Sequence, residues 1–180
     1  MNGNNPFIKC GTTDTLGNGT GQVSVNMSDF GYSASLTVQV PRYRGIENPF
    51  GHIWQWTDGI LVQVTEDARR VYVCSDPKNF ADTVGTGYVY VGDEVKADGY
   101  VKEMIFGEGG EIMPSVVGGS SSTYFCDYHY KGEDTQNVRG LLFGVSAVSG
   151  ANAGLVSARS NRVPSNAAAP FGSRLCFIPE

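Results

Sequence analysis

The chain has 180 residues and a formal net charge of −5, with 13 Lys and Arg residues against 18 Asp and Glu residues. This length suits one domain with a single core, and so few basic residues exclude a protein that binds nucleic acid through a positive surface. No run approaches the ~20 apolar residues of a membrane span, and MNGNNPF lacks the basic and apolar parts of a secretion signal. We therefore expect neither membrane insertion nor export by that route.

The chain divides into a polar start and one folded region. Residues 1–30 are polar and glycine-rich, and we expect an extended lead-in or anchor there, followed by one domain over residues 31–180. Within that domain, short runs of β-branched and aromatic residues between turn residues predict strands. These runs are residues 35–40, 60–64, 71–74 and 88–91.

Helices are expected to be short, because no apolar pattern with helical spacing persists for three turns. The two best candidates for a helical turn are Arg42–Asn48 and Asp76–Ala81. Residues 107–122 are rich in glycine and serine, and they predict a long loop.

The segment Glu47–Gly59, ENPFGHIWQWTDG, holds the densest group of large side chains. In an extended segment Trp54 and Trp56 point to one face. We expect Trp54 to be a buried core anchor. The alternative is that an exposed Trp56 forms an aromatic platform for a sugar, for which the sequence identifies no second, polar wall.

The ionisable residues do not form a recognisable catalytic or metal-binding motif. His52 and His129 are the only histidines, and we expect each to be packed with one satisfied ring nitrogen. We expect four carboxylates to lie on solvated surface, although calcium bound by loop oxygens remains an alternative; they are Glu108, Glu111, Glu133 and Asp134. We expect no cofactor, no metal and no catalytic residue.

The four cysteines lie too far apart in sequence for a zinc knuckle or a vicinal redox pair. They are Cys10, Cys74, Cys126 and Cys176. We expect small buried apolar residues, with a disulfide as the alternative.

Two segments resemble the family of the formylglycine-generating enzyme and the sulfatase-modifying factors. GHIWQWTDG is similar to its G-N-V-W-E-W-x-x-D turn, and VRGLLFG followed by GSRLC is similar to its closing R-G-G-S-W … G-F-R-L pattern. Over residues 41–178 the resemblance implies an α+β, C-type-lectin-like fold with short antiparallel strands, few short helices and long loops. It implies the structural core residues Trp54, Trp56, Arg139, Gly140 and Arg174.

Departures from the family pattern point to its non-catalytic branch. The enzyme's close cysteine pair is missing from residues 144–150, and two histidines cannot supply the three that the iron-dependent relatives need. STYFCDYHY, GANAG, NRVPSN and FGSRLCF resemble structural proteins of gut phages and the variable proteins of diversity-generating retroelements. The resemblance implies a phage fibre domain on the virion surface, which forms a homotrimer, contacts other virion subunits and binds a bacterial surface receptor, either glycan or protein.

The same resemblance implies that side chains between the two closing motifs are displayed for receptor contact. Glycines and alanines there allow close backbone packing, while a few larger or polar groups project. The expected receptor-binding residues are Val145, Ser146, Val148, Ser149, Asn152, Leu155, Ser157, Arg159, Asn161 and Arg162. A packed strand–turn–strand that closes the domain is the alternative.

Two other functions remain open from the sequence. One is a capsid-decorating or fibre-attachment protein that packs only against other virion subunits. The other is residual glycan hydrolase activity, which would need two carboxyl groups ~5 to 9.5 Å apart in a cleft.

Overall fold

A computed structural model describes most of the chain between residues 14 and 173. The described residues are 14–16, 21–26, 35–40, 42–44, 46–47, 49–107, 110–133, 135–146, 157–168 and 170–173.

The described chain is nearly all β, so the predicted α+β, C-type-lectin-like fold is wrong. Its helical residues form only two 3-10 turns, η1 (Asp14–Leu16) and η3 (Pro77–Asn79). No helix in the described ranges has the length and apolar character needed to cross a membrane. The strands are β1 (Gly21–Asn26), β2 (Ser35–Val40), β3 (Arg42–Tyr43), β4 (Ile46–Glu47), β5 (Trp54–Val64), β6 (Arg69–Val73), β7 (Val89–Asp93), β8 (Gly99–Phe106), β9 (Ile112–Val117), β10 (Tyr128–Tyr130), β11 (Asn137–Phe143), β12 (Ala158–Arg162) and β13 (Phe171–Gly172).

The four predicted strands are confirmed as β2, β5, β6 and β7. One predicted helical turn and one predicted loop need correction. Arg42–Asn48 forms no helical turn, because β3 and β4 pair around Arg44, whose φ is +48°. The predicted loop 107–122 contains β9, which pairs with β8 because Ile112 to Val117 supplies enough β-branched and apolar residues. The expected turn at Asp76–Ala81 is η3, where the Asp76 side chain caps Lys78 N.

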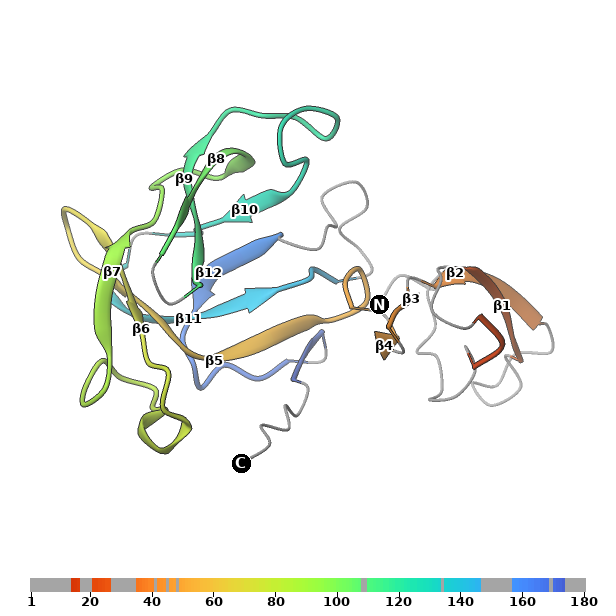
Figure 1. Ribbon diagram of the computed structural model, residues 1–180, viewed down its shortest axis with the longest axis horizontal. Coiled ribbons are helices and arrows are strands. Elements are labelled where there is room, and N and C mark those ends of the chain that lie inside the picture. The colour runs from red at the N-terminus through yellow and green to blue at the C-terminus, as the bar shows by residue number, and fades with distance from the viewer. Residues whose placement is uncertain are drawn as a thin grey trace.

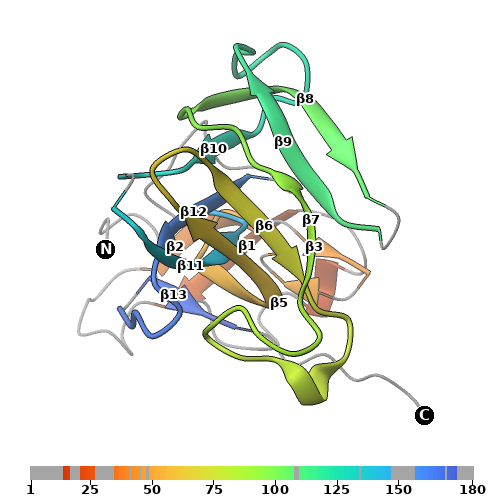
Figure 2. The same cartoon turned by 90° about the vertical axis from the view of Figure 1, so that its left-hand side faces the viewer.

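One large sheet runs in the order β7-β6-β5-β11-β12-β10-β8-β9, with β13 added beside β5. Figures 1 and 2 show this sheet curling, so that β8 and β9 lie over the side formed by β6 and β7. The Val95 N–H, just after β7, donates to the Pro114 carbonyl oxygen of β9 at 3.1 Å. The two ends of the sheet therefore approach each other, and the curl is nearly closed.

A separate hairpin is formed by β1 and β2, which pair antiparallel from Gly21–Val40 to Asn26–Ser35. It lies to one side of the large sheet in Figure 1. Its valines form their own small core, with Leu16 and Leu36 packed against it; they are Val23, Val25, Val38 and Val40. The first strand thus comes from the predicted lead-in, and its partner comes from the predicted domain.

Alternate residues of the large sheet point to two faces. On the inner face of the curl, Val62, Val64 and Val71 pack with Met113 of β9. On the outer face, Trp54 and Leu142 form a second cluster. Trp54 is 4% exposed, which confirms the prediction that it is a core anchor.

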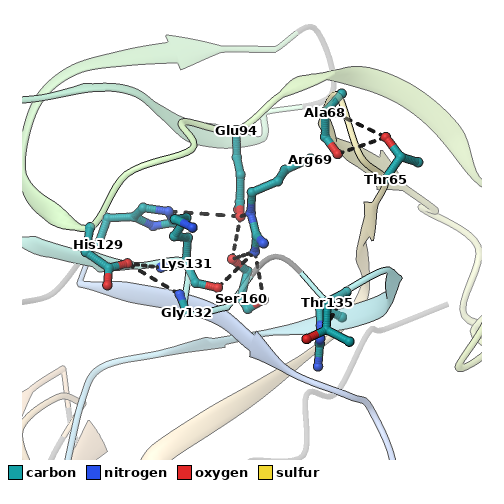
Figure 3. A network of polar contacts seen from close by, with 11 residues as sticks. Thr65, Ala68, Arg69, Glu94, His129, Lys131, Gly132, Thr135 and Ser160 are labelled. Carbon is teal, nitrogen blue, oxygen red and sulfur yellow. Dashed lines mark hydrogen bonds and ion pairs between the residues drawn. The ribbon is translucent and has the colours of Figure 1, made fainter.

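A buried polar cluster crosses the inside of the curled sheet. Arg69, at the start of β6, is fully buried, and its Nε donates to Glu94 Oε1 at 2.6 Å. Arg69 Nη2 donates to the Ser160 carbonyl oxygen and hydroxyl at 2.9 and 2.8 Å and to the Lys131 carbonyl oxygen at 3.1 Å. Ser160 Oγ in turn donates to Glu94 Oε1 at 2.5 Å (Figure 3). We call Arg69, Glu94 and Ser160 the clamp, because they join β6 and the end of β7 to β12.

His129 of β10 lies beside the clamp and is 1% exposed, with its Nε2 4.0 Å from Glu94 Oε1. Burial lowers the pKa of the imidazole, and the positive charge of Arg69 lowers it further. The carboxylates of Glu94 and Asp98 and the Val95 backbone oppose this shift. The net effect keeps His129 neutral in the folded protein under conditions where an exposed histidine begins to take up a proton.

Removing Arg69 should destabilise the protein strongly, because Glu94 would remain buried without its positive partner. We expect Arg69→Met to lower the free energy of unfolding by about 3–5 kcal/mol. The neighbouring Arg70 is exposed, and Arg70→Met should change it by less than ~0.5 kcal/mol. Urea unfolding of both variants checks this. Similar losses of unfolding free energy in the two would contradict a stabilising role for the clamp.

His129 should make the protein less stable in acid. Its pKa is lower in the folded state, so the unfolded state takes up a proton first as the pH falls below ~6.5, and stability is lost until the folded-state pKa is reached. His129→Leu should therefore show a flatter loss of stability between pH 7 and pH 5 than the parent protein. pH-dependent urea unfolding of the two proteins checks this, and equal slopes would contradict the lowered pKa of His129 in the folded state.

Candidate binding groove

A bulge in β5 creates the groove that is the best candidate for a functional site. Leu61 pairs with Gly140 and Thr57 pairs with Leu141, so three residues of β5 have no partner on β11. Within this bulge Asp58 is exposed, and Gly59 adopts a φ of +78°. A bulge of this kind bends the strand and increases its local twist.

Gly59 is required where the bulge meets the loop around η3. A Cβ at this position would lie 2.6 Å from the Cys74 carbonyl oxygen and 2.7 Å from the Phe80 ring. The Cys74 N–H donates to the Gly59 carbonyl oxygen at 2.8 Å. This close approach brings Phe80, Ala81 and Asp82 to the same groove as the bulge.

The groove has a volume of about 370 Å³ and mixes apolar with polar walls. Trp56 and Phe80 provide aromatic surface. Asp58, Asp82 and Ser173 are exposed and provide oxygen atoms. Since ionised carboxylates are hydrogen-bond acceptors only, Asp58 and Asp82 favour a ligand that presents several donors, such as hydroxyl groups.

The half-buried Trp56 ring is held in place by its neighbours. A Cβ on Gly140 would lie 2.7 Å from the six-membered ring of the indole, so only glycine leaves room for it. Trp56 also makes an edge contact with Phe171 of β13, with ring centres 6.0 Å apart and planes at 70°. The groove therefore presents an aromatic surface in a fixed orientation.

Arg159 of β12 continues this outer face beyond Phe171. Its guanidinium lies 4.7 Å from the centre of the Trp54 ring and 5.8 Å from that of Phe171. Its Nε donates to Asn161 Oδ1 at 2.6 Å. Burial lowers the pKa of Arg159, and the charge of Arg162 acts in the same direction. Arg159 therefore packs against the aromatic rings of this face and also gives the face a positive charge.

The structure separates the predicted receptor-binding residues into three groups. Val145, Ser146 and Ser157 are 0%, 7% and 0% exposed, so the expectation that their side chains project outward is wrong. Arg159 and Asn161 are half-buried on the outer face, and Arg162 is exposed and pairs with Gly140 of the groove. The remaining four lie outside the described residues; they are Val148, Ser149, Asn152 and Leu155.

Ser157 and Val145 are buried for identifiable reasons. Ser157 Oγ donates to Asp127 Oδ1 at 3.3 Å and accepts from the Tyr128 N–H at 3.2 Å, so the hydroxyl joins β10 to the start of β12. Val145 belongs to the apolar cluster around Trp54 and Leu142. Both side chains therefore pack inside the domain.

Four of the five predicted core residues lie within the described part of the chain, and Trp54 is buried as stated above. Gly140 is buried, while Trp56 and Arg139 are half-buried. Arg139 Nη2 donates to the Thr135 carbonyl oxygen at 3.0 Å, and Arg174 lies outside the described residues.

Cysteines and carboxylates do not assemble into a second site in the part of the chain that the structure describes. Cys74 is buried and Cys126 half-buried, and both are free thiols; Cys10 and Cys176 lie outside the described residues. Glu133 is exposed as predicted, whereas Glu111 is half-buried. Within the described ranges, no group of three His, Cys, Asp or Glu residues is arranged to hold a metal ion.

Asp58, Phe80 and Asp82 were not predicted from the sequence as groove residues. The only sequence signal was the Asp58-Gly59 pair after the tryptophans, which is typical of a turn or bulge. Nothing in the sequence shows that residues 80–82 fold back onto this bulge.

Comparison with models of known protein families finds no match. Comparisons with curated protein sequences and with solved structures also find none. Any function assigned to the groove therefore depends on its own geometry and on the sequence motifs.

Arg159 and Arg162 should contribute differently to stability. Arg159→Ala removes a stacked guanidinium and a hydrogen bond and should cost about 1–2 kcal/mol of unfolding free energy. Arg162 is exposed, and Arg162→Ala should cost less than ~0.5 kcal/mol. Thermal and urea unfolding of the two single variants checks this difference, and equal stabilities would show that the stacking contributes nothing.

Proposed function

We propose that this protein is a non-catalytic recognition domain that binds a neutral saccharide of a bacterial surface in the Trp56 groove. The observation that carries the proposal is the group of polar side chains that lines the same groove as the indole. Asp58, Asp82 and Ser173 line the same groove as Trp56, and all three are exposed. They supply the second wall that the sequence alone did not identify.

The chemistry of the groove matches that of a sugar ring. The face of an indole carries partial negative charge and attracts the weakly positive C–H groups of a pyranose face. Asp58 and Asp82 can each accept hydrogen bonds from sugar hydroxyls. Two carboxylates disfavour acidic sugars by charge repulsion, and we therefore assign the groove to neutral ones.

The surrounding face supports recognition by contact rather than by catalysis. The two carboxylates of the groove, Asp58 and Asp82, are both exposed, whereas hydrolysis of a glycan needs one carboxyl group held in an apolar pocket as the general acid. The described residues of the predicted receptor-binding segment that reach the surface are the polar residues Arg159, Asn161 and Arg162. A mixed polar surface of this kind suits a reversible contact with a receptor.

The assignment to a phage fibre comes from the resemblance of the motifs to gut-phage structural proteins. In this proposal the domain sits on the virion surface as a homotrimer, with the N-terminal residues toward the fibre. Several tethered copies would raise the avidity of a weak saccharide site by about 10²- to 10⁴-fold. The proposal does not include the lectin-like fold, which the all-β structure contradicts.

A second candidate function is a structural one, in which the domain packs only against other virion subunits. It is favoured by exposed apolar side chains on β8 and β9. These are Ile105, Phe106, Ile112 and Val116, which are 43%, 68%, 49% and 36% exposed. A permanent interface would cover such residues.

The groove proposal is tested by binding of the purified protein to an array of neutral and acidic bacterial surface oligosaccharides. We expect binding to neutral glycans, and a loss of about thirtyfold or more for Trp56→Ala. Since Trp56 also contacts Phe171, a second variant, Asp58→Ala with Asp82→Ala, separates recognition from packing. This pair should abolish binding while leaving the melting temperature unchanged.

Asp67→Ala is the matched control, because Asp67 is exposed and lies outside the groove. It should bind like the parent protein. Unaltered glycan binding by the Asp58/Asp82 double variant would show that the groove is not the glycan-binding site. If no glycan binds and an antibody to this chain labels the shell of the intact particle rather than a distal tip, the structural function is the correct one.

A further inference from the structure

The inside of the curled sheet contains a second cavity, with a volume of about 200 Å³. Its walls come from β5, β6, β8, β9, β10, β11 and β12, and it shares only Thr57 and Ile60 with the lining of the Trp56 groove. Packed protein interiors rarely leave a space of this size unfilled. Most of the lining is apolar, and four of these side chains are only 1–4% exposed: Val62, Val71, Val101 and Met113.

The ionisable groups that line the cavity carry one unbalanced negative charge. They are Glu94, Glu111 and His129, and none of the described lining residues is a lysine or an arginine. Glu94 is already paired with the buried Arg69 of the clamp (Figure 3). Burial keeps His129 neutral by lowering its pKa. The unbalanced charge is therefore that of Glu111, whose carboxylate makes no hydrogen bond or ion pair to another described residue.

Glu111 lies where the cavity meets the solvent, at the turn between β8 and β9. It precedes Met113 by two residues, so in an extended segment both side chains point to the inner face, and both line the cavity. A Cβ on Gly107 would overlap the Glu111 carboxylate, so glycine at that position leaves room for it. Glu111 is half-buried, and its neighbour Ile112 lines the cavity although it is 49% exposed. The carboxylate thus stands at the mouth of an apolar space.

We propose that this cavity binds a small organic amine with an apolar body, whose ammonium group pairs with Glu111 at the mouth. Burial of the apolar body between apolar walls is favourable. An ammonium group is costly to bury without a partner, so it belongs at the mouth, where Glu111 supplies the opposite charge and water is close. An anionic amphiphile such as a fatty acid is disfavoured, because its charge would meet Glu94 and Glu111.

The volume sets the size of the amine. An engineered apolar cavity of about 150 Å³ accommodates benzene. A cavity of about 200 Å³ therefore has room for a benzene ring with a short side chain. In 2-phenylethylamine the ring would occupy the cavity, and the two-carbon chain would carry the ammonium group toward the mouth.

The experiment compares 2-phenylethylamine with ethylbenzene, which has the same ring and chain without the amine, in titrations followed by NMR or calorimetry. We expect the parent protein to bind both. Glu111→Gln should weaken the binding of the amine about fivefold and leave that of ethylbenzene unchanged. Glu103→Gln is the matched control, because Glu103 is exposed on β8 and does not line the cavity. It should bind both probes like the parent protein.

The location of the bound probe is tested separately. Ala158 of β12 lines the cavity, so Ala158→Phe should fill the space and abolish the binding of both probes. A second measurement needs no variant. Met104 and Met113 both line the cavity, and their methyl resonances in the parent protein should shift on addition of either probe.

Four results would overturn the proposal. The first is a parent protein that does not bind the amine. The second is equal affinity for the amine in the parent protein and in Glu111→Gln, or the same loss in Glu103→Gln as in Glu111→Gln. The third is binding of the amine that survives in Ala158→Phe, and the fourth is an unchanged pair of Met104 and Met113 methyl signals at saturating amine.

Discussion

The buried ion pair between Arg69 and Glu94 is the constraint on which the rest of the structure depends. A charge with no exposure to water is tolerated only when it is paired and its remaining hydrogen bonds are satisfied. Arg69 meets this condition through Glu94, Ser160 and Lys131, which come from three different parts of the chain. The pair therefore connects β6 and the end of β7 to β12 and to the end of β10 across the inside of the curl.

The curl gives the two faces of the same strands different roles. In β10, Tyr128 and Tyr130 point outward with their ring centres 4.4 Å apart, while His129 between them lines the inner cavity. In β11, Leu142 joins the outer cluster around Trp54, whereas its neighbours Leu141 and Phe143 line the cavity. One set of strands thus lines both the outer Trp56 groove and an inner, mainly apolar cavity.

The environments implied by the lectin-like resemblance hold at Trp54 and Gly140, but not at Val145, Ser146 and Ser157, and the implied fold is wrong. Trp54 is buried and Gly140 is packed against Trp56, as the family motifs imply. These requirements are local, because a tryptophan beside a small residue on the next strand can occur in many sheets. The all-β topology, with β13 added parallel to β5 and β10 parallel to β12, arises from pairings that motifs do not encode.

The sequence by itself determined the strands with strong alternation, such as those at residues 35–40 and 60–64, and the burial of Trp54, because these follow from side-chain periodicity and size. It also contains no recognisable catalytic or metal-binding motif. Only the tertiary structure decided that Asp82 lines the same groove as Trp56, that Val145 and Ser157 are buried, and that Arg69 pairs with Glu94. The physical reason is that each of these contacts joins segments distant in the chain, and the free energy that selects such a partner is gained only when the whole sheet has closed.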